Sequence, residues 1–301
     1  MSDEPESSET VSEPSWTIGR LLNWTTEFLT EKGIDSPRLE AEVLLAHARS
    51  CQRIELYAAF EEAAEEPLRE RFRSLVKERA AGKPVAYLVG QREFYSLSFQ
   101  VTPDVLIPRP ETEQLVLRSL DIAKGIEADP LRIADIGTGS GVLAVCLAKY
   151  LPEARVTAAD VSPAALEVAR KNAERHEVNT RIRFVESDLF GQVPAEVKYE
   201  IIVSNPPYVK TSELAELAID VRGYEPALAL DGGEQGVDVI SRLVAQAAER
   251  LNPGGWLLME IGPSTVEDTE QLVRDTPGLE LKPTLTDDAD LPRIVQAQRQ
   301  S

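Results

Sequence analysis

The chain has 301 residues and a formal net charge of −19, with 43% hydrophobic and 28% charged residues, a balance that is ordinary for a folded globular protein. No apolar run approaches the roughly 20 residues needed to span a bilayer, so the sequence predicts no membrane segment. Proteins that grip nucleic acid rely on Lys and Arg to displace counterions, and the acidic charge therefore predicts no direct nucleic-acid partner.

The N-terminal stretch, residues 1–15, contains several acidic side chains and no basic one. It lacks the basic start and apolar run of a signal peptide, and it is predicted to be a disordered acidic tail. The whole chain has only two cysteines, Cys51 and Cys146, both in apolar, helix-like surroundings. Reduced thiols and a cytoplasmic location are the expectation.

Residues 16–84 show apolar side chains near the helical period. One helix is expected to begin near Ile18, and a second at Asp35-Ser36-Pro37, where proline suits the first turn. Two more are expected around 53–60 and 67–80. The pattern predicts a small helical domain of about four helices. It contains no catalytic motif, and its expected role is to bind a partner.

Residues 85–110 change in character. The segments 85–89 and 93–101 mix β-branched and aromatic residues, which favours a β-hairpin that links two domains. Pro103, Pro108 and Pro110 interrupt any regular element that follows.

In the remaining segment, 111–301, apolar strands and helical patterns alternate from Leu131 onward. Strands are expected at 132–136, 154–159, 181–186, 200–204 and 255–261. Helices are expected at 141–150, 163–176 and 237–251, followed by a last helix and a hairpin. This alternation predicts an α/β, Rossmann-like domain with a mostly parallel sheet that is covered on both faces.

A glycine-rich loop closes the first of these strands. It runs Gly137-Thr138-Gly139-Ser140-Gly141 and opens a helix, as expected for a loop whose backbone approaches a ligand closely. The spacing is G-x-G-x-G, and position 142 is valine. The dinucleotide fingerprint G-x-G-x-x-G therefore fits poorly, which disfavours an NAD-dependent oxidoreductase.

Two acidic residues follow the next strands. Asp160 lies about 20 residues beyond the loop, where a carboxylate accepts hydrogen bonds from ribose hydroxyls, and Ser162 is the better candidate for the helix cap. Asp188 is expected to bond an adenine amino group while Leu189 covers the ring. A simple turn residue is the equal alternative for Asp188.

The sequence Asn205-Pro206-Pro207-Tyr208 follows another apolar strand. Two prolines fix the backbone and make a rigid loop at the strand's carboxyl end, where open α/β sheets bind ligands. The Asn205 oxygen and a carbonyl, expected to be that of Pro206, are suited to hold the two N–H groups of a planar amide, and Tyr208 is suited to pack on it. These residues predict an S-adenosylmethionine-dependent methyltransferase that acts on an amide or amino nitrogen.

With these motifs in place, the chain resembles the release-factor glutamine N5-methyltransferase family over nearly all of its length after Trp16. The stretches that carry the resemblance are residues 82–88, 92–95, 106–116, 135–141, 205–208 and 224–233. The segment Ile107-Pro108-Arg109-Pro110-Glu111 is the most specific, because nucleic-acid amino-methyltransferases share the Asn-Pro-Pro-Tyr loop but usually lack it.

The resemblance implies methylation of the glutamine in the Gly-Gly-Gln loop of class I peptide-chain release factors. It implies a five-helix-like N-terminal domain, a hairpin and a seven-stranded methyltransferase domain. By resemblance, residues 205–208 hold the amide, and the cofactor contacts are Gly137 to Gly141, Asp160, Asp188, Leu189 and Asn205. Arg109 and Glu111 would form the pocket mouth, with a structural salt bridge or a helix start as equal alternatives.

The chain departs from the family at two places. Residues 263–265 are Pro-Ser-Thr where the family often has Gln, and Leu189 stands where some members have an aromatic residue. Both concern cofactor packing rather than the type of reaction.

Two other functions remain open from the sequence. A nucleic-acid methyltransferase acting on N6 of adenine or N4 of cytosine would use the same loop, because an exocyclic amino group is planar like an amide. A non-catalytic partner-binding protein is the other, and the intact Gly137, Asp160 and Asn205 argue against it.

Overall fold

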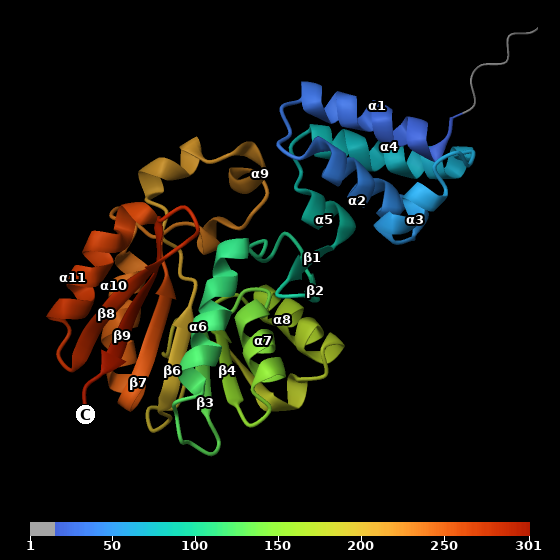
Figure 1. Cartoon of the computed structure of the whole chain (residues 1–301). Helices are drawn as coiled ribbons and strands as arrows, with labels where there is room; N and C mark the ends of the chain where they lie inside the picture. The colour runs from blue at the N-terminus through green and yellow to red at the C-terminus, as the bar shows by residue number, and fades with distance from the viewer. Residues whose placement is uncertain (1–15) are drawn as a thin grey trace, which may run out of the picture. The chain divides into compact units, whose positions relative to one another are not determined.

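The computed structural model describes residues 16–301, so the predicted acidic tail lies outside the described residues. The described chain forms two compact units, one that ends at Val89 and one that runs from Gly90 to Ser301 (Figure 1). None of the helices described between residues 16 and 301 combines the length and apolar character that crossing a bilayer requires.

The first unit is a helical bundle with its own apolar core (Figure 1). Helix α1 begins after Thr17, whose hydroxyl accepts a hydrogen bond from the Arg20 N–H and so caps the helix. Leu22, Leu45 and Leu56 are fully buried where the helices meet. The expected helices of this unit are confirmed as α1 (Ile18–Glu31), α2 (Pro37–Arg49), α3 (Arg53–Ala58) and α4 (Glu66–Ala80).

The expected β-strand at 85–89 is wrong, because this segment is a fifth helix, α5 (Val85–Val89). The N–H groups of Tyr87 and Leu88 donate to the Pro84 carbonyl, which starts the helical turn, and Gly90 ends it with a φ of +72°. Its apolar side chains pack into the helical core of the first unit. Strand propensity was overridden by the partners available to pack against, as tertiary context commonly does.

The hairpin itself is shorter than expected and consists of β1 (Gln91–Phe94) and β2 (Leu97–Gln100). It is fastened to helix α8 (Pro163–Arg175) of the second unit by Asn172. This amide accepts a hydrogen bond from the Gln100 N–H at 2.7 Å and donates to the Gln100 carbonyl at 3.0 Å. The hairpin therefore belongs structurally to the second unit.

The second unit contains a seven-stranded sheet in the order β5-β4-β3-β6-β7-β9-β8 within the described residues. Strand β9 is antiparallel to both of its neighbours, and the other pairings are parallel. The strands are β3 (Arg132–Ile136), β4 (Arg155–Asp160), β5 (Ile182–Glu186), β6 (Tyr199–Ser204), β7 (Leu251–Glu260), β8 (Leu279–Thr286) and β9 (Pro292–Arg299). The expected mostly parallel, Rossmann-like sheet is confirmed.

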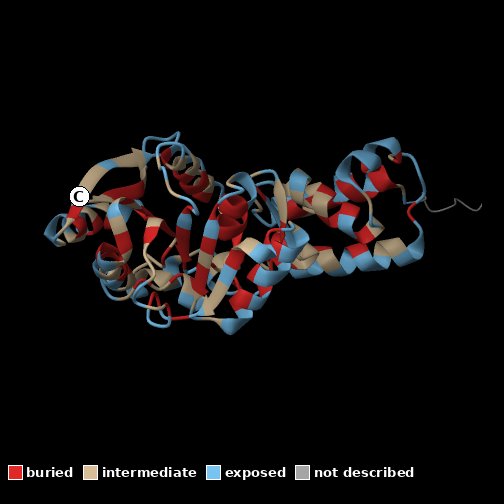
Figure 2. Ribbon diagram, turned by 90° about the horizontal axis from the view of Figure 1, so that it is seen from below, coloured by how far each residue is buried: buried red, intermediate tan, exposed pale blue. Residues whose placement is uncertain are grey.

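Helices cover both faces of this sheet and bury its apolar strands in two core clusters. Helices α6 (Glu113–Ala123), α7 (Val142–Tyr150) and α8 contribute to one cluster, and α10 (Asp238–Arg250) and α11 (Val266–Asp275) contribute to the other. Buried residues follow the strands and the inward sides of these helices (Figure 2). The sequence predicted α6 only as a helix start, the alternative role of Arg109 and Glu111, and it did not predict the short helix α9 (Ile219–Arg222).

The register of the parallel strands determines where the motifs meet. Strand β3 pairs with β4 on one side and β6 on the other, so the loops after all three emerge at one carboxyl edge. The Ser204 hydroxyl donates to the Ile136 carbonyl at 2.6 Å and ties the ends of β6 and β3 together. The glycine loop, Asp160 and Asn205 thus face one region.

Candidate active site

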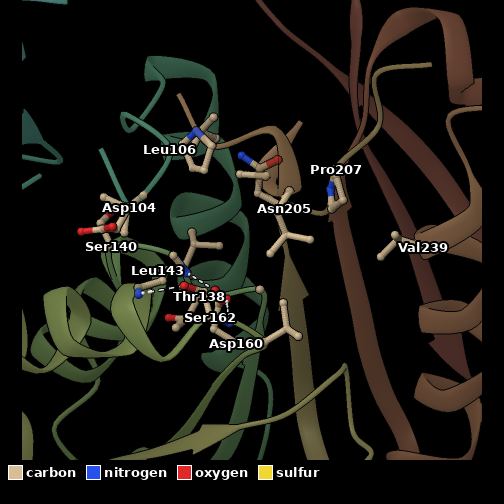
Figure 3. Close-up of a pocket in the computed structure, with 18 of the residues that line it drawn as sticks. Asp104, Leu106, Thr138, Ser140, Leu143, Asp160, Ser162, Asn205, Pro207 and Val239 are labelled. Atoms are coloured by element: carbon tan, nitrogen blue, oxygen red, sulfur yellow. Dashed lines mark hydrogen bonds between the residues drawn. The ribbon is translucent and has the colours of Figure 1, made fainter. Parts of the chain in front are cut away.

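A cavity of about 380 Å³ opens at this carboxyl edge, within the size range of small-molecule sites. Figure 3 shows Asn205 and Pro207 on one side of it, with Thr138 and Asp160 on another. The predicted site residues that line it are Gly137, Thr138, Gly139, Ser140, Asp160, Asp188, Leu189, Asn205, Pro207 and Arg109. Residues that lie about a hundred positions apart in the sequence, such as Arg109 and Pro207, therefore line the same cavity.

The glycine loop presents bare backbone to the cavity. Gly137 and Gly139 have φ values of +75° and +54°, and a Cβ added at either would meet no atom within 4 Å. Gly141 serves a different purpose, because an added Cβ there would lie 3.0 Å from the Cβ of Ala169 on α8. Two glycines thus leave room for a ligand, and the third allows α7 and α8 to pack closely.

Asp160 ends β4 and turns its carboxylate toward the glycine loop. One oxygen accepts the Gly139 N–H at 2.8 Å, and the other accepts the Ser162 N–H at 2.9 Å. Burial raises the pKa of Asp160 above its ordinary value, although these backbone hydrogen bonds oppose the shift. The predicted cap is confirmed separately, since the Ser162 hydroxyl accepts the Ala165 N–H.

Asp135 is a fully buried carboxyl beneath the glycine loop, and the sequence alone did not predict a role for it. Its Oδ2 accepts the Thr138 hydroxyl at 2.6 Å and the Ala144 N–H at 3.0 Å, while its Oδ1 has no partner. Burial raises the pKa of Asp135 to about 7. The carboxyl fixes the loop to the start of α7, because it bonds both.

Asp188 lines the cavity, but its carboxylate is already engaged. It forms an ion pair with Arg242 of α10, and both side chains are more than half exposed. Leu189 beside it is buried with a φ of +51°, a strained conformation for a leucine that is found mainly at functional turns. The predicted contact of Asp188 with an adenine group remains a prediction.

Asn205 directly follows β6, and its side-chain amide is held by a residue from a distant part of the chain. Its Nδ2 donates to the hydroxyl of Thr112 at 3.3 Å, and both residues line the cavity. Thr112 belongs to the Pro110–Thr112 turn that follows the Ile-Pro-Arg-Pro segment. The two most specific segments of the sequence therefore meet at this asparagine.

Four predicted residues do not line the cavity, namely Gly141, Pro206, Tyr208 and Glu111. Pro206 is buried, and the ring of Tyr208 packs against Gly262, where an added Cβ would lie 3.0 Å from the ring. Burial raises the pKa of Tyr208 to about 12, so the phenol stays protonated. The expected contact of Gly141 with the cofactor and those of the other three residues with a substrate stay predictions.

Arg109 combines the two alternatives that the sequence left open. Its guanidinium donates to the Glu225 carboxylate at 2.7 Å, and its side chain also lines the cavity. Glu225 is 6% exposed and accepts the Ile107 N–H as well. This ion pair joins the 106–116 segment to the 224–233 segment across one wall of the cavity.

The residues present fit S-adenosylmethionine. The open positions above Gly137 and Gly139 provide space against the backbone, and the Asp160 carboxylate offers acceptors for ribose hydroxyls. Leu189 and Val161 supply apolar surface for a flat ring. A nucleoside bound between these groups would leave the Asn205 side of the same cavity for the substrate.

Comparison with known proteins agrees with this geometry. The family model described as the PrmC N-terminal domain matches residues 20–90, and the methyltransferase small domain matches residues 113–221. The release factor glutamine methyltransferase of Rhodopirellula baltica is 45% identical over 97% of this chain and 99% of its own length. The protein of that name from Koribacter versatilis is 40% identical over 94% of this chain and 99% of its own.

Solved structures support the fold. A methyltransferase from Pyrococcus furiosus is 21% identical, with a TM-score of 0.51, over 76% of this chain and 98% of its own. The T. thermophilus 16S rRNA N2 G1207 methyltransferase, solved with AdoMet and guanosine, is 22% identical, with a TM-score of 0.51, over 70% of this chain and 50% of its own.

The fold and the cavity define a Rossmann-like methyltransferase whose methyl donor is S-adenosylmethionine. The relatives match nearly the whole chain at 40% and 45% identity, and they identify the family within this class. The chain belongs to the release factor glutamine methyltransferase family.

Proposed function

We propose that this chain, in the cytoplasm, transfers the methyl group of S-adenosylmethionine to the side-chain amide nitrogen of the glutamine in the Gly-Gly-Gln motif of class I peptide-chain release factors. The observation that carries the proposal is Asn205 at the end of β6, lining the cofactor cavity while Thr112 holds its Nδ2. The Asn205 Oδ1 is then left to accept an N–H from the substrate amide.

The chemistry needs positioning more than it needs a base. S-adenosylmethionine supplies an electrophilic methyl group on a sulfonium. The amide nitrogen is a weak nucleophile because its lone pair is delocalised, and holding it in line with its target is worth up to roughly 7–11 kcal/mol. The bound cofactor would give up its methyl group to this nitrogen with loss of the methyl–sulfur bond, and the nitrogen would then lose one proton.

We propose the remaining site roles on the same basis. Asp160 holds the ribose, and the Gly137 to Gly141 loop supports the cofactor through its backbone. Arg109, Asn205 and Pro207 form the wall that meets the substrate. Tyr208 stiffens the loop at 205–208 by packing against Gly262, and the Glu111 carboxylate lies close enough to raise the pKa of the Tyr208 phenol.

Methylation of a nucleic-acid amino group is not favoured. Relatives that match nearly the whole chain are named for release factor glutamine, and the likeness to an rRNA methyltransferase supports the fold alone. The net charge of −19 is also unsuited to a phosphate backbone.

The test is to incubate the protein with methyl-labelled cofactor and a class I release factor, and to map the label by peptide mass spectrometry. Label on the Gly-Gly-Gln glutamine, lost when that glutamine is replaced by asparagine, is the expected result. No label, or label on another residue, would contradict the proposal. Parallel reactions with duplex DNA and with RNA check the alternative directly.

A further inference from the structure

A buried carboxyl lies next to Asn205 on the neighbouring strand. Strands β6 and β7 run parallel with Ser204 opposite Met259, so the next residues, Asn205 and Glu260, emerge side by side at the carboxyl edge. Glu260 is 3% exposed and is not among the described residues that line the cavity. Any influence of Glu260 on a ligand in the cavity therefore passes through its neighbours.

Those neighbours are the polar groups that hold the asparagine. Asn205 Nδ2 donates to the Thr112 hydroxyl at 3.3 Å, and both side chains lie beside the Glu260 carboxyl, where their polar groups lower its pKa. Thr112 is itself only 3% exposed. Three elements distant in sequence thus contribute one side chain each to a buried network behind the Asn205 amide.

This network bears on which way the amide points. An asparagine side chain has an acceptor at one end and donors at the other, and the proposed chemistry needs the acceptor toward the substrate. The Thr112 hydroxyl can donate or accept, so it does not select either orientation. An ionised carboxylate only accepts, and it selects the orientation with Nδ2 inward.

We propose that Glu260 is a positioning residue that fixes the Asn205 amide with Nδ2 toward the protein and Oδ1 toward the substrate nitrogen. This inference rests on the proposed function and adds a residue to it. It also accounts for a carboxyl in an apolar setting, where a buried acid costs stability unless it has partners or a purpose.

The charge state of Glu260 sets a condition on this role. Burial raises the pKa of Glu260 to about 7, and one of its oxygens, Oε2, has no hydrogen-bond partner. Glu111 raises this pKa further, while Arg293 of β9, which pairs with Asp287, lowers it. The Tyr208 phenol also lies near Glu260 and stays neutral.

Protonation would change what Glu260 offers to Asn205. The neutral carboxyl can donate as well as accept, and it then permits the reversed amide, with Oδ1 inward. Methyl transfer should therefore decline as the pH falls below about 7, by about tenfold for each pH unit at the steepest. The substrate amide does not titrate in this range and would not produce that decline.

Glu260→Gln tests the role, because glutamine keeps the shape and removes the charge. We expect kcat to fall by roughly 10- to 100-fold, as for loss of one preorganised polar contact, and the acid decline to disappear. Affinity for S-adenosylhomocysteine and the release-factor KM should stay within about threefold. Unchanged kcat and an unchanged pH profile would overturn the proposal, as would an equal loss confined to KM.

Glu200→Gln is the matched control. Glu200 lies at the opposite end of β6, where its carboxylate accepts the Arg132 N–H and the Asn252 amide. This variant makes the same chemical change in the same sheet and should keep the wild-type kcat and pH profile. Asp135→Asn tests the other buried acid with a pKa of about 7 and should retain the acid decline.

A second measurement does not depend on catalysis. The side-chain amide signal of Asn205, observed by ¹⁵N NMR and assigned by its loss in Asn205→Ala, should shift with pH around 7 in the wild type and remain fixed in Glu260→Gln. An Asn205 signal that ignores pH in the wild type would overturn the positioning role. Failure of the wild type to methylate a release factor would instead contradict the proposed function and leave this result standing.

Discussion

Two loops leave the same edge of the sheet and hold their ligands in different ways. The loop at 137–141 offers backbone and open space, with positive φ values that glycine adopts without strain. The loop at 205–208 is stiffened by two prolines and offers one side chain, Asn205, which Thr112 holds and which lies beside Glu260 in the β6–β7 register. Holding a cofactor by its backbone contacts is a local property of the chain. Orienting an amide requires side chains from several elements.

Among variants that compare the two loops, removal of the Asn205 side-chain amide should have the largest effect on catalysis. We expect Asn205→Ala to lower kcat/KM by about 10³-fold, because the substrate nitrogen loses its only proposed side-chain acceptor. Cofactor affinity, measured by calorimetry with S-adenosylhomocysteine, should change little, since the glycine loop and Asp160 remain. Activity within about tenfold of wild type would remove Asn205 from the role.

Removing Asp160, the carboxylate proposed to hold the cofactor, should weaken cofactor binding and leave turnover largely intact. Asp160→Ala loses a charge-assisted hydrogen bond of about 1.5–3 kcal/mol, which corresponds to roughly 10- to 150-fold weaker cofactor binding. Turnover at saturating cofactor should fall far less than in Asn205→Ala. An unchanged dissociation constant would mean that the ribose binds elsewhere.

Glu260, which lies beside the loop at 205–208, should also make the free energy of unfolding depend on pH. The folded state raises the pKa of Glu260 from 4.5 to about 7, so the folded protein binds this proton more tightly than the unfolded chain does. Its stabilising contribution is full below pH 4.5 and is lost as the pH rises through 7. Between pH 5 and 8 the wild type should lose about 2 kcal/mol from this group.

Urea unfolding at several pH values measures this loss, with Glu260→Gln as the comparison. The variant should lack that part of the pH dependence, while Glu200→Gln should keep it. Parallel curves for wild type and Glu260→Gln would show that Glu260 titrates normally in the folded state.

The smallest expected effect comes from two glycine variants, which distinguish the cost of backbone strain from the loss of space for the cofactor. Gly139→Ala and Gly254→Ala each place an alanine at positive φ, at +54° and +78°, with no atom within 4 Å of the new Cβ. Each should cost about 1 kcal/mol in unfolding free energy. Only Gly139→Ala should also weaken cofactor binding, by about tenfold, because its Cβ enters the cavity. Equal binding by both variants would contradict the proposed cofactor position.

The sequence predicted the features that are encoded locally. Strand β3, the glycine turn and helix α7 follow one another without interruption, and Ser162 could be identified as a cap from its position before Pro163. The Asn-Pro-Pro-Tyr loop is also continuous with its strand. In each case neighbouring residues determine the conformation, so periodicity and turn chemistry suffice.

The features that the sequence did not predict depend on distant packing. The segment 85–89 has the composition of a strand and becomes α5 because its partners are helices. Thr112 meets Asn205 across 93 positions, and no spacing rule indicates this. Glu260 ends an apolar strand that was recognised, yet its place beside Asn205 follows only from the β6–β7 register.

The account's central claim is that a cofactor and a glutamine amide share one cavity and meet at Asn205. A crystal structure with S-adenosylhomocysteine and a Gly-Gly-Gln peptide tests this most directly. It should show the ribose at Asp160, and the glutamine nitrogen hydrogen-bonded to the Asn205 Oδ1 and facing the sulfur. A nucleoside bound in another cleft, or a glutamine amide held away from Asn205, would contradict the claim.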